Sequence, residues 1–579
     1  MENELFEPLQ TFENELEKKH EKLTEEYFEE LVEKSGVNIE ENAATLQKRN
    51  KILEELKDTN KYLKKYRRIR TLVIVSIILL ALVGAVCGLY FSGNNDLFFL
   101  CILIPSICLC GIIGLIVVIC VKINKKINSG SLLADRLNAE AEQLKQDAWN
   151  QMCELNVKFD WNTPAELVAK TLPLIKIDKY FDQKKFKYFA ENFNLCGDLD
   201  DTRSIYCVKS GSSNGNPFLQ VRYFNQSFTE QRYDGYLTVE WTEELPGLNG
   251  STTYVKRSEK LCASVYKPKP TYDFLTVLYY ANDAAPDLRF SRSPVVPAGA
   301  DENKIQSIIK SGEKKLEKKV RTAVKTGEQF NKLANSEFEV LFGADDRNNE
   351  MQFRLIFTPL AQQNEVKLIR KSSYGDDFSF IKNGKINLIH SLHGGLLDID
   401  CNPEFFTGYD FTAIKNKFIN FNKVYFKSIY FDFAPLFAIP AYMQDKPKEE
   451  YGECDRRGQI GEWELESLAN FFDSDLVSAP DTATDTIVKA RAVQNTENGC
   501  VTEVTGHSFR AVQMVDYVSV KCKNGNYYNV AVPWIDYIPI HTVTTMQVEA
   551  ADITREDFIK SQEGSNRKIF VNGLKANLL

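Results

Sequence analysis

Two long runs of apolar residues restrict the possible folds of this chain more than any other feature. Residues 72–91 and residues 97–121 contain no charged side chain. A helix of about 20 apolar residues is long enough to cross the hydrocarbon core of a bilayer. Only the polar residues 92–96 separate the two runs. The sequence therefore predicts a transmembrane helical hairpin over residues 71–121.

Basic residues flank the predicted hairpin on both sides. The positive-inside rule places such residues on the cytosolic face of the membrane. We therefore expect two spans with both termini in the cytoplasm and the lipid bilayer as a partner. The basic residues that precede the first span and follow the second are Lys61, Lys64, Lys65, Arg67, Arg68, Arg70, Lys122, Lys125 and Lys126.

The composition excludes several classes of protein. The 579-residue chain has a net charge of -8, so its overall charge gives no attraction to nucleic acid, which we do not expect as a partner. Its 13 cysteines include no CxxC pair, which is typical of a reducing compartment rather than a disulfide framework or a zinc site.

Heptad-like patterns precede and follow the predicted spans. Apolar residues recur at three- and four-residue spacing in residues 8–34, before a break at Ser35-Gly36 and an N-cap at Asn38. His20 lies within this pattern, and we considered it either as a pH sensor or as a partly exposed histidine. With a third pattern in residues 122–158, residues 1–70 and 122–158 predict an antiparallel helical stalk. Such a stalk could bind a protein partner or a second copy of the chain.

The rest of the chain predicts an α+β fold in three parts. Residues 159–300 predict a lobe of short antiparallel strands, including 217–224, 236–241, 261–266 and 274–280. Residues 301–445 predict a second α+β lobe, with a strand at 338–342 and a hairpin that turns at Asn383-Gly384. Residues 446–579 predict a small β-barrel or roll, whose strongest signal is the hairpin turn at 523–526.

Three segments carry a resemblance to known proteins. These are NPFLQVRYFNQSFTEQRYDGYLTVEWTEE, EQFNKLANSEFEVLFGADD and FRLIFTPLAQ, which begin at residues 216, 328 and 353. They resemble a group of bacterial proteins in which a double-spanning N-terminal anchor precedes a cytosolic domain of unknown function. The resemblance implies the bacterial inner membrane as the location, and it implies no site residues.

One cluster could hold a metal ion. His390, His393, Asp398 and Asp400 combine imidazole and carboxylate ligands, as zinc or manganese sites do. The alternative is that the two histidines, at a strand end beside Gly394-Gly395, do not converge. The Tyr-Gly-Asp-Asp string at 374–377 is interpreted as a polar turn, and Gly211 to Gly215 as a hairpin loop. The sequence thus predicts no catalytic residue and no cofactor.

Small residues suggest how the two spans pack. Gly84 and Gly88 are four residues apart in the first span, and Ser106, Cys110 and Gly114 recur every four residues in the second. Close approach of helices in lipid depends on such residues. We therefore expect these two faces to pack against each other within the chain.

These features favour a membrane-anchored cytosolic scaffold or binding protein that is not an enzyme. Two alternatives remain open at this stage. One is a membrane-tethered, metal-assisted hydrolase that uses the cluster near His390. The other is a ligand sensor that signals through the helical stalk.

Overall fold

The computed structural model confirms the predicted α+β class, with two antiparallel sheets and two compact units. Unit 1 comprises Met1–Tyr27, Asp160–Phe405 and Ile419–Leu579, and unit 2 comprises Phe28–Phe159 and Phe406–Phe418. The structure describes residues 7–92, 98–193, 201–246, 252–327, 330, 332–371, 376–395, 399, 401–444, 460–496, 498–550 and 567–579. Within these ranges it leaves out the side chains of residues 87–92, 98–102, 104, 105, 192, 193, 393, 395 and 444.

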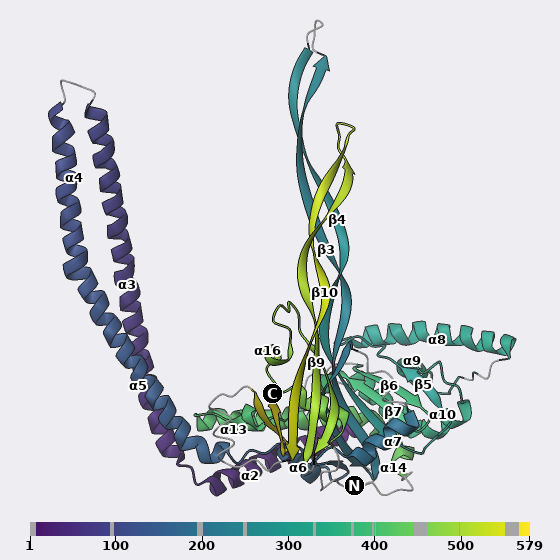
Figure 1. Cartoon of the computed structure of the whole chain (residues 1–579). Helices are drawn as coiled ribbons and strands as arrows, with labels where there is room; N and C mark the ends of the chain where they lie inside the picture. The colour runs from purple at the N-terminus through teal and green to yellow at the C-terminus, as the bar shows by residue number, and fades with distance from the viewer. Residues whose placement is uncertain are drawn as a thin grey trace. The chain divides into compact units, whose positions relative to one another are not determined.

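Unit 2 contains a hairpin of two very long helices (Figure 1). Helix α3 spans Ile39–Ser92, and α4 (Phe98–Val118) continues through the π-helical turn η3 (Ile119–Ile123) into α5 (Asn124–Asn156). The predicted break before α3 is confirmed, because Gly36 has φ +64° and the Asn38 side chain accepts a hydrogen bond from Glu41 N at 3.1 Å. The 54 residues of α3 form one helix roughly 80 Å long.

An apolar seam joins α3 to α5 within this hairpin. Its buried members are Leu56, Leu63, Ile123, Ile127, Ala134 and Leu137. Gly130 lies where a Cβ atom would come within 2.8 Å of the Leu63 side chain, so this glycine permits the close approach of the two helices. The polar part of the hairpin is thus held together as an antiparallel helix pair.

The N-terminal segment belongs to the core of unit 1. It forms α1 (Pro8–Thr11), the π-helical turn η1 (Phe12–Leu16) and the first part of α2 (Glu17–Ser35), whose residues from Phe28 on belong to unit 2. Its buried residues Leu9, Phe12 and Leu16 join the main core, and the Tyr430 hydroxyl donates to the Pro8 carbonyl oxygen at 2.7 Å. The sequence predicted a place for this segment in a three-helix stalk. Instead, residues before and after the apolar runs build one core.

A seven-stranded antiparallel sheet organises unit 1, in the order β1-β2-β3-β4-β7-β6-β5. It joins strands from both predicted α+β lobes. The hairpin turn at Gly384 is confirmed, with φ +62°, and Asn214 and Gly215 form the hairpin turn between β2 and β3. The strands are β1 (Ile175–Ile177), β2 (Arg203–Ser213), β3 (Asn216–Pro246), β4 (Thr252–Ala281), β5 (Arg289–Arg292), β6 (Phe378–Asn383) and β7 (Ile386–Ser391).

The prediction of four short strands within residues 217–280 was wrong. Strand β3 has 31 residues and β4 has 30. Residues 225–235, which lie between two of the predicted short strands, continue β3 because they extend outside the globular core. A strand that lies outside the core needs no apolar face, so a polar sequence does not by itself end it.

The C-terminal residues form an open five-stranded antiparallel sheet in the order β11-β12-β10-β9-β8. Among the described residues no barrel closes, which corrects the prediction of a β-barrel or roll. The predicted hairpin turn is confirmed, with Gly525 at φ +89°. The strands are β8 (Ile487–Thr496), β9 (Gly499–Lys521), β10 (Tyr527–Ala550), β11 (Lys568–Val571) and β12 (Leu574–Leu578).

The hairpins β3–β4 and β9–β10 extend beyond their sheets and wind around each other (Figure 1). We call residues 226–246, 252–277, 508–521 and 527–545 the β-spike. Its small core includes Val239, Leu261, Val530 and Val532. At the crossing, a Cβ atom on Gly235 would lie 2.2 Å from the Ala531 carbonyl oxygen. Only glycine allows this backbone contact.

The helices of unit 1 range from single turns to the long helices α8, with 25 residues, and α13, with 27. The residues predicted as a strand at 338–342 belong to helix α9, which Asn335 caps and Gly343 ends at φ +71°. A short apolar run does not distinguish a helix from a strand. The helices are α6 (Thr163–Thr171), α7 (Gln183–Phe193), α8 (Glu302–Thr326), α9 (Ser336–Phe342), α10 (Glu350–Ile356), α11 (Pro359–Lys371), α12 (Leu392–Gly395), η4 (Pro403–Phe406, 3-10, in both units), α13 (Phe411–Phe437, in both units), α14 (Pro440–Gln444), α15 (Glu462–Ala469) and α16 (Ser474–Val477).

Candidate functional site

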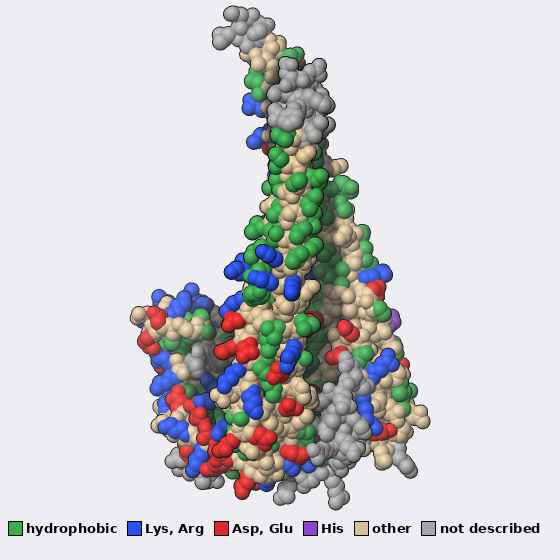
Figure 2. Space-filling view, turned by 90° about the vertical axis from the view of Figure 1, so that its left-hand side faces the viewer, with side chains coloured by type: hydrophobic (Ala, Val, Ile, Leu, Met, Phe, Trp, Pro, Cys, Tyr) green, Lys and Arg blue, Asp and Glu red, His purple; other side chains and the backbone are tan. Residues whose placement is uncertain are grey.

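The strongest candidate for a functional element is the apolar end of the α3–α4 hairpin. Both helices are long and apolar enough to cross a membrane, and only 6% and 11% of their most apolar windows are buried. Leu72 and Leu79 are 66% and 57% exposed on α3, and Leu109 is 58% exposed on α4. Figure 2 shows apolar side chains along this shaft with Lys and Arg side chains below them. A core helix of a soluble domain would bury such residues.

The small residues of the two spans occupy different environments. Gly84 is buried, whereas Ser106 and Cys110 are exposed, and a Cβ atom at Gly114 would meet no atom within 4 Å. The surroundings of Gly88 lie outside the described side chains. Gly111 is the glycine of α4 that comes near α3, since its Cβ would lie 3.8 Å from the Leu80 side chain. The packing of Gly84 and Gly88 against Ser106, Cys110 and Gly114 stays a prediction.

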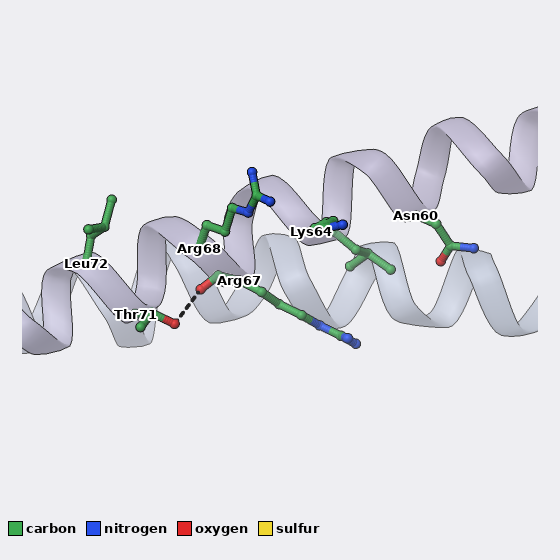
Figure 3. Close-up of a pocket in the computed structure, with 7 residues that line it drawn as sticks. Asn60, Lys64, Arg67, Arg68, Thr71 and Leu72 are labelled. Atoms are coloured by element: carbon green, nitrogen blue, oxygen red, sulfur yellow. Dashed lines mark hydrogen bonds between the residues drawn. The ribbon is translucent and has the colours of Figure 1, made fainter.

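A groove lies on α3 where the basic segment meets the apolar run (Figure 3). Its volume is about 650 Å³. Lys64, Arg68 and Leu72 are four residues apart, so they follow one face of the helix. In Figure 3 the Arg68 and Leu72 side chains extend from the same edge, and Arg67 extends from the opposite one. The groove has cations at one end and an apolar side chain at the other. Its lining is Asn60, Leu63, Lys64, Arg67, Arg68, Thr71 and Leu72.

Carboxylates are scarce around this groove. The nearest acidic residue before it is Asp58, which pairs with Lys61 at 2.9 Å. Within the part of the chain that the structure describes, Lys64, Arg67 and Arg68 form no ion pair. From the other helix, Lys126 Nζ donates to the Tyr66 hydroxyl at 3.0 Å, which brings a further cation to the same level of the hairpin.

Most of the predicted metal ligands lie outside the residues that the structure describes. Asp398 and Asp400 are not described, and neither is the side chain of His393. His390 lies in β7, where its Nδ1 is 2.8 Å from the Thr276 carbonyl oxygen. Among the described residues no group of three or more His, Cys, Asp or Glu side chains could hold a metal ion. The metal site stays a prediction.

A buried carboxyl that the sequence analysis did not identify, that of Asp432, contacts Ser391, the residue that follows His390. Asp432 of α13 accepts hydrogen bonds from Ser391 Oγ at 2.5 Å and from Gln220 Nε2 at 2.9 Å. Gly394 leaves room for it, since a Cβ there would be 2.6 Å from Oδ1. Burial raises the pKa of Asp432 to about 7. The Asp432 side chain is buried, so we interpret it as part of the hydrogen-bonded core and not as a group that meets a ligand.

His20 is buried in unit 1 rather than partly exposed. Its Nδ1 lies 2.7 Å from Thr171 Oγ1, its Nε2 lies 3.1 Å from the Asn422 carbonyl oxygen, and the ring stacks on Phe426. The Asn422 carbonyl oxygen can only accept, so a neutral ring donates from Nε2–H and accepts at Nδ1 from the Thr171 hydroxyl. That hydroxyl proton is then not available to the Leu167 carbonyl oxygen, which lies 2.8 Å from Thr171 Oγ1. Burial lowers the pKa of His20 to about 4.

The Tyr-Gly-Asp-Asp string does not present paired carboxylates. Asp376 is buried against the Arg292 guanidinium, and its other oxygen accepts from Val295 N at 2.5 Å. Tyr374 and Gly375 lie outside the described residues. Since the Asp376 carboxylate is already bound, it is part of a buried ion pair.

The outer face of β9–β10 in the β-spike is exposed and carries almost no charge. Tyr517 and Tyr527 are 70% and 67% exposed, and Val515 pairs with Pro533 across the hairpin on the same face. Lys521 is the one charged residue among 513, 515, 517, 519, 521, 527, 529, 531, 533 and 535. Exposed aromatic residues without charge are typical of protein-binding surfaces.

No protein-family model matches this chain, and no curated protein or solved structure shows significant similarity to it. The resemblance to bacterial proteins with a double-spanning anchor therefore rests on the three quoted segments alone.

Proposed function

We propose that this chain is a membrane-anchored scaffold that holds a binding domain at the cytosolic surface of the bacterial inner membrane. The observation that supports it best is the shared core of unit 1. Leu9, Phe12 and Leu16 precede the hairpin, yet they pack with residues such as Tyr430 that follow it. Both ends of an inserted hairpin must then lie on the same side of the membrane.

The exposed apolar shaft supports insertion rather than docking on a surface. A helix satisfies all of its backbone hydrogen bonds internally, which is required in lipid. The basic residues Lys64, Arg67 and Arg68 at the foot of the shaft favour a cytosolic location for that end. The domain would then stay in the cytosol, attached by the hairpin.

Labelling with an impermeant thiol reagent tests this proposal. After replacement of the native cysteines, we expect the reagent to label a cysteine at Asn94 when it is added to spheroplasts with an intact inner membrane. A cysteine at the exposed Lys314 of α8 should be labelled only after lysis. The chain should also stay in the membrane pellet at alkaline pH. Labelling of Lys314→Cys before lysis, or extraction by carbonate, would refute the proposal.

The scaffold part of the proposal assigns protein binding to the uncharged face of the β-spike. A partner that co-purifies in stoichiometric amount from membranes in mild detergent should be lost in the Tyr517→Lys, Tyr527→Lys variant. A matched change on the charged face of β3–β4, Tyr236→Lys with Tyr254→Lys, should retain it. If both variants retain the partner, it binds elsewhere.

A further inference from the structure

We propose that the groove on α3 binds the headgroup of an anionic phospholipid. The inference rests on the proposed membrane anchoring and goes beyond it, because a hairpin can be anchored without any preference for one lipid. Lys64, Arg67 and Arg68 supply the cations, and Leu72 begins the apolar shaft directly beside them.

The charge of the groove is unbalanced within the protein. Residues 59–92 and 98–134 contain no Asp or Glu. Three exposed cations thus lie on two turns of one helix with no carboxylate among them. A phosphate group supplies the missing negative charge, and arginine side chains match its geometry with paired N–H donors.

The size and shape of the groove suit a lipid. Its volume of about 650 Å³ lies in the range of small-molecule sites, about 300–1,000 Å³. The polar end is formed by Lys64 and Arg68, and the apolar end by Leu72, which is 66% exposed. A ligand that fits both ends has an anionic group joined to hydrocarbon, which excludes a free phosphate as the best fit.

The second helix reinforces the same level of the hairpin. Lys126 Nζ lies 3.0 Å from the Tyr66 hydroxyl and 4.9 Å from the centre of its ring. Lys122 and Lys125 are exposed close by in sequence. These cations widen the region of positive potential around the groove, and aromatic residues such as Tyr66 commonly lie at the headgroup level of membranes.

Native mass spectrometry of the full chain from nanodiscs tests the proposal. The nanodiscs contain phosphatidylcholine and phosphatidylglycerol in equal amounts. Each basic residue near an anionic surface corresponds to about a fivefold preference, so the wild-type chain should retain phosphatidylglycerol with a strong preference. The Lys64→Gln, Arg67→Gln, Arg68→Gln variant should lose most of that preference.

The control variant removes the same charge elsewhere in unit 2. Lys48, Lys51 and Arg136 are exposed, and none of them lines the groove. Lys48→Gln with Lys51→Gln and Arg136→Gln should keep the wild-type preference. Thermal unfolding in detergent establishes that both variants are folded.

Four results would overturn the inference. The wild-type chain could retain both lipids equally, the groove variant could keep its preference, the control variant could lose its own, or soluble glycerol phosphate could displace the lipid with comparable affinity. In the last case the ligand is a free anion. Each of these results leaves the membrane anchor intact. Failure of the chain to remain in nanodiscs at all would instead refute the proposed function.

Discussion

The α3–α4 hairpin and the β3–β4 hairpin are both long antiparallel excursions of the chain, and they differ in where their backbone hydrogen bonds go. Each helix bonds its own N–H and C=O groups. In the β-spike, pairing of β3 with β2 ends at Asn225, and pairing of β4 with β7 begins at Leu278. After Asn225 in β3 and before Leu278 in β4, one edge of each strand has no partner strand among the described residues. Such an edge needs water, so only the helical hairpin suits lipid.

The prolines of the β-spike agree with this difference. Pro268 and Pro270 lie in β4, and Pro533 and Pro539 lie in β10. A proline has no N–H group, so strands tolerate it at free edges. It also hinders the pairing of such an edge with another chain. The free strand edges of the β-spike are therefore suited to water, whereas the surface of the helical shaft is apolar.

The largest effect should come from charges placed on the shaft. Leu79→Arg with Leu109→Arg adds one arginine to each span, at a cost of about 2.5–3.5 kcal/mol per residue near the middle of a bilayer. We expect the fraction of chain in the carbonate-resistant membrane pellet to fall more than about tenfold, since about 1.4 kcal/mol corresponds to a factor of ten.

The matched control places arginines on the β-spike. Tyr266→Arg and Tyr517→Arg change side chains that are 60% and 70% exposed, and membrane retention should be unchanged. Equal retention of the shaft variant and the wild type would show that the shaft does not enter lipid.

The second effect separates the helical shaft from the core of unit 1 by pH. Residues 72–86 and 106–121 contain no Asp, Glu, His, Lys or Arg, whereas unit 1 buries His20 and Asp432. The His20 pKa of about 4 lies below its unfolded value, so its contribution to stability is complete above about pH 6.5 and is lost as the pH falls toward 4. The loss is up to about 3 kcal/mol.

Asp432 has the opposite dependence. Its pKa of about 7 lies above the unfolded value, so its contribution is complete below about pH 4 and is lost as the pH rises toward 7. The two slopes oppose each other in the wild-type protein. Urea unfolding between pH 4 and 8 should give His20→Gln a stability that rises on acidification and Asp432→Asn one that falls. Parallel curves for the two variants would contradict these pKa values.

The smallest effect concerns two glycines that permit close approaches. At Gly235 an added methyl group would meet the Ala531 carbonyl oxygen at 2.2 Å, and this backbone atom cannot move aside. Gly235→Ala should lower the free energy of unfolding by about 1–3 kcal/mol, as overpacking does. At Gly130 the nearest atom, at 2.8 Å, is the end of the flexible Leu63 side chain.

Gly130→Ala is therefore the matched control. The gain in helix propensity, about 1 kcal/mol, offsets the movement of Leu63, so its unfolding free energy should change little. A larger loss at Gly130 than at Gly235 would mean that the helical seam, rather than the β-spike crossing, is the tighter contact.

The shaft could be predicted from the sequence because its cause is local. A run of twenty or more consecutive apolar residues is typical of a membrane-spanning helix. The break before α3 could likewise be predicted from two neighbouring residues, Gly36 and Asn38. The α9 helix could have been predicted from Asn335 and Gly343, which were overlooked beside the apolar run. The position of Gly130 against Leu63 depends on helix pairing, which the pattern predicts only approximately.

The β-spike and the shared core could not be predicted in the same way, because their causes are distant in sequence. Nothing near Gly235 shows that Ala531 will cross it. Nothing in residues 8–27 shows that they pack on α13 rather than on α3. The groove at Lys64 was partly predictable, since the basic run was identified, but its combination with Leu72 required the helix to continue without a break from the polar segment into the apolar one.

The contact between Pro8 and Tyr430 sets an order of events during synthesis. The two residues are 422 positions apart, so at roughly 5–20 residues per second the ribosome needs about 20 to 85 s to make the second after the first. During that interval residues 71–121 have already been made, while Phe426, Tyr430 and Phe431, whose rings contact Phe12, do not yet exist. The N-terminal segment therefore completes its contacts with α13 only after about three quarters of the chain has been made.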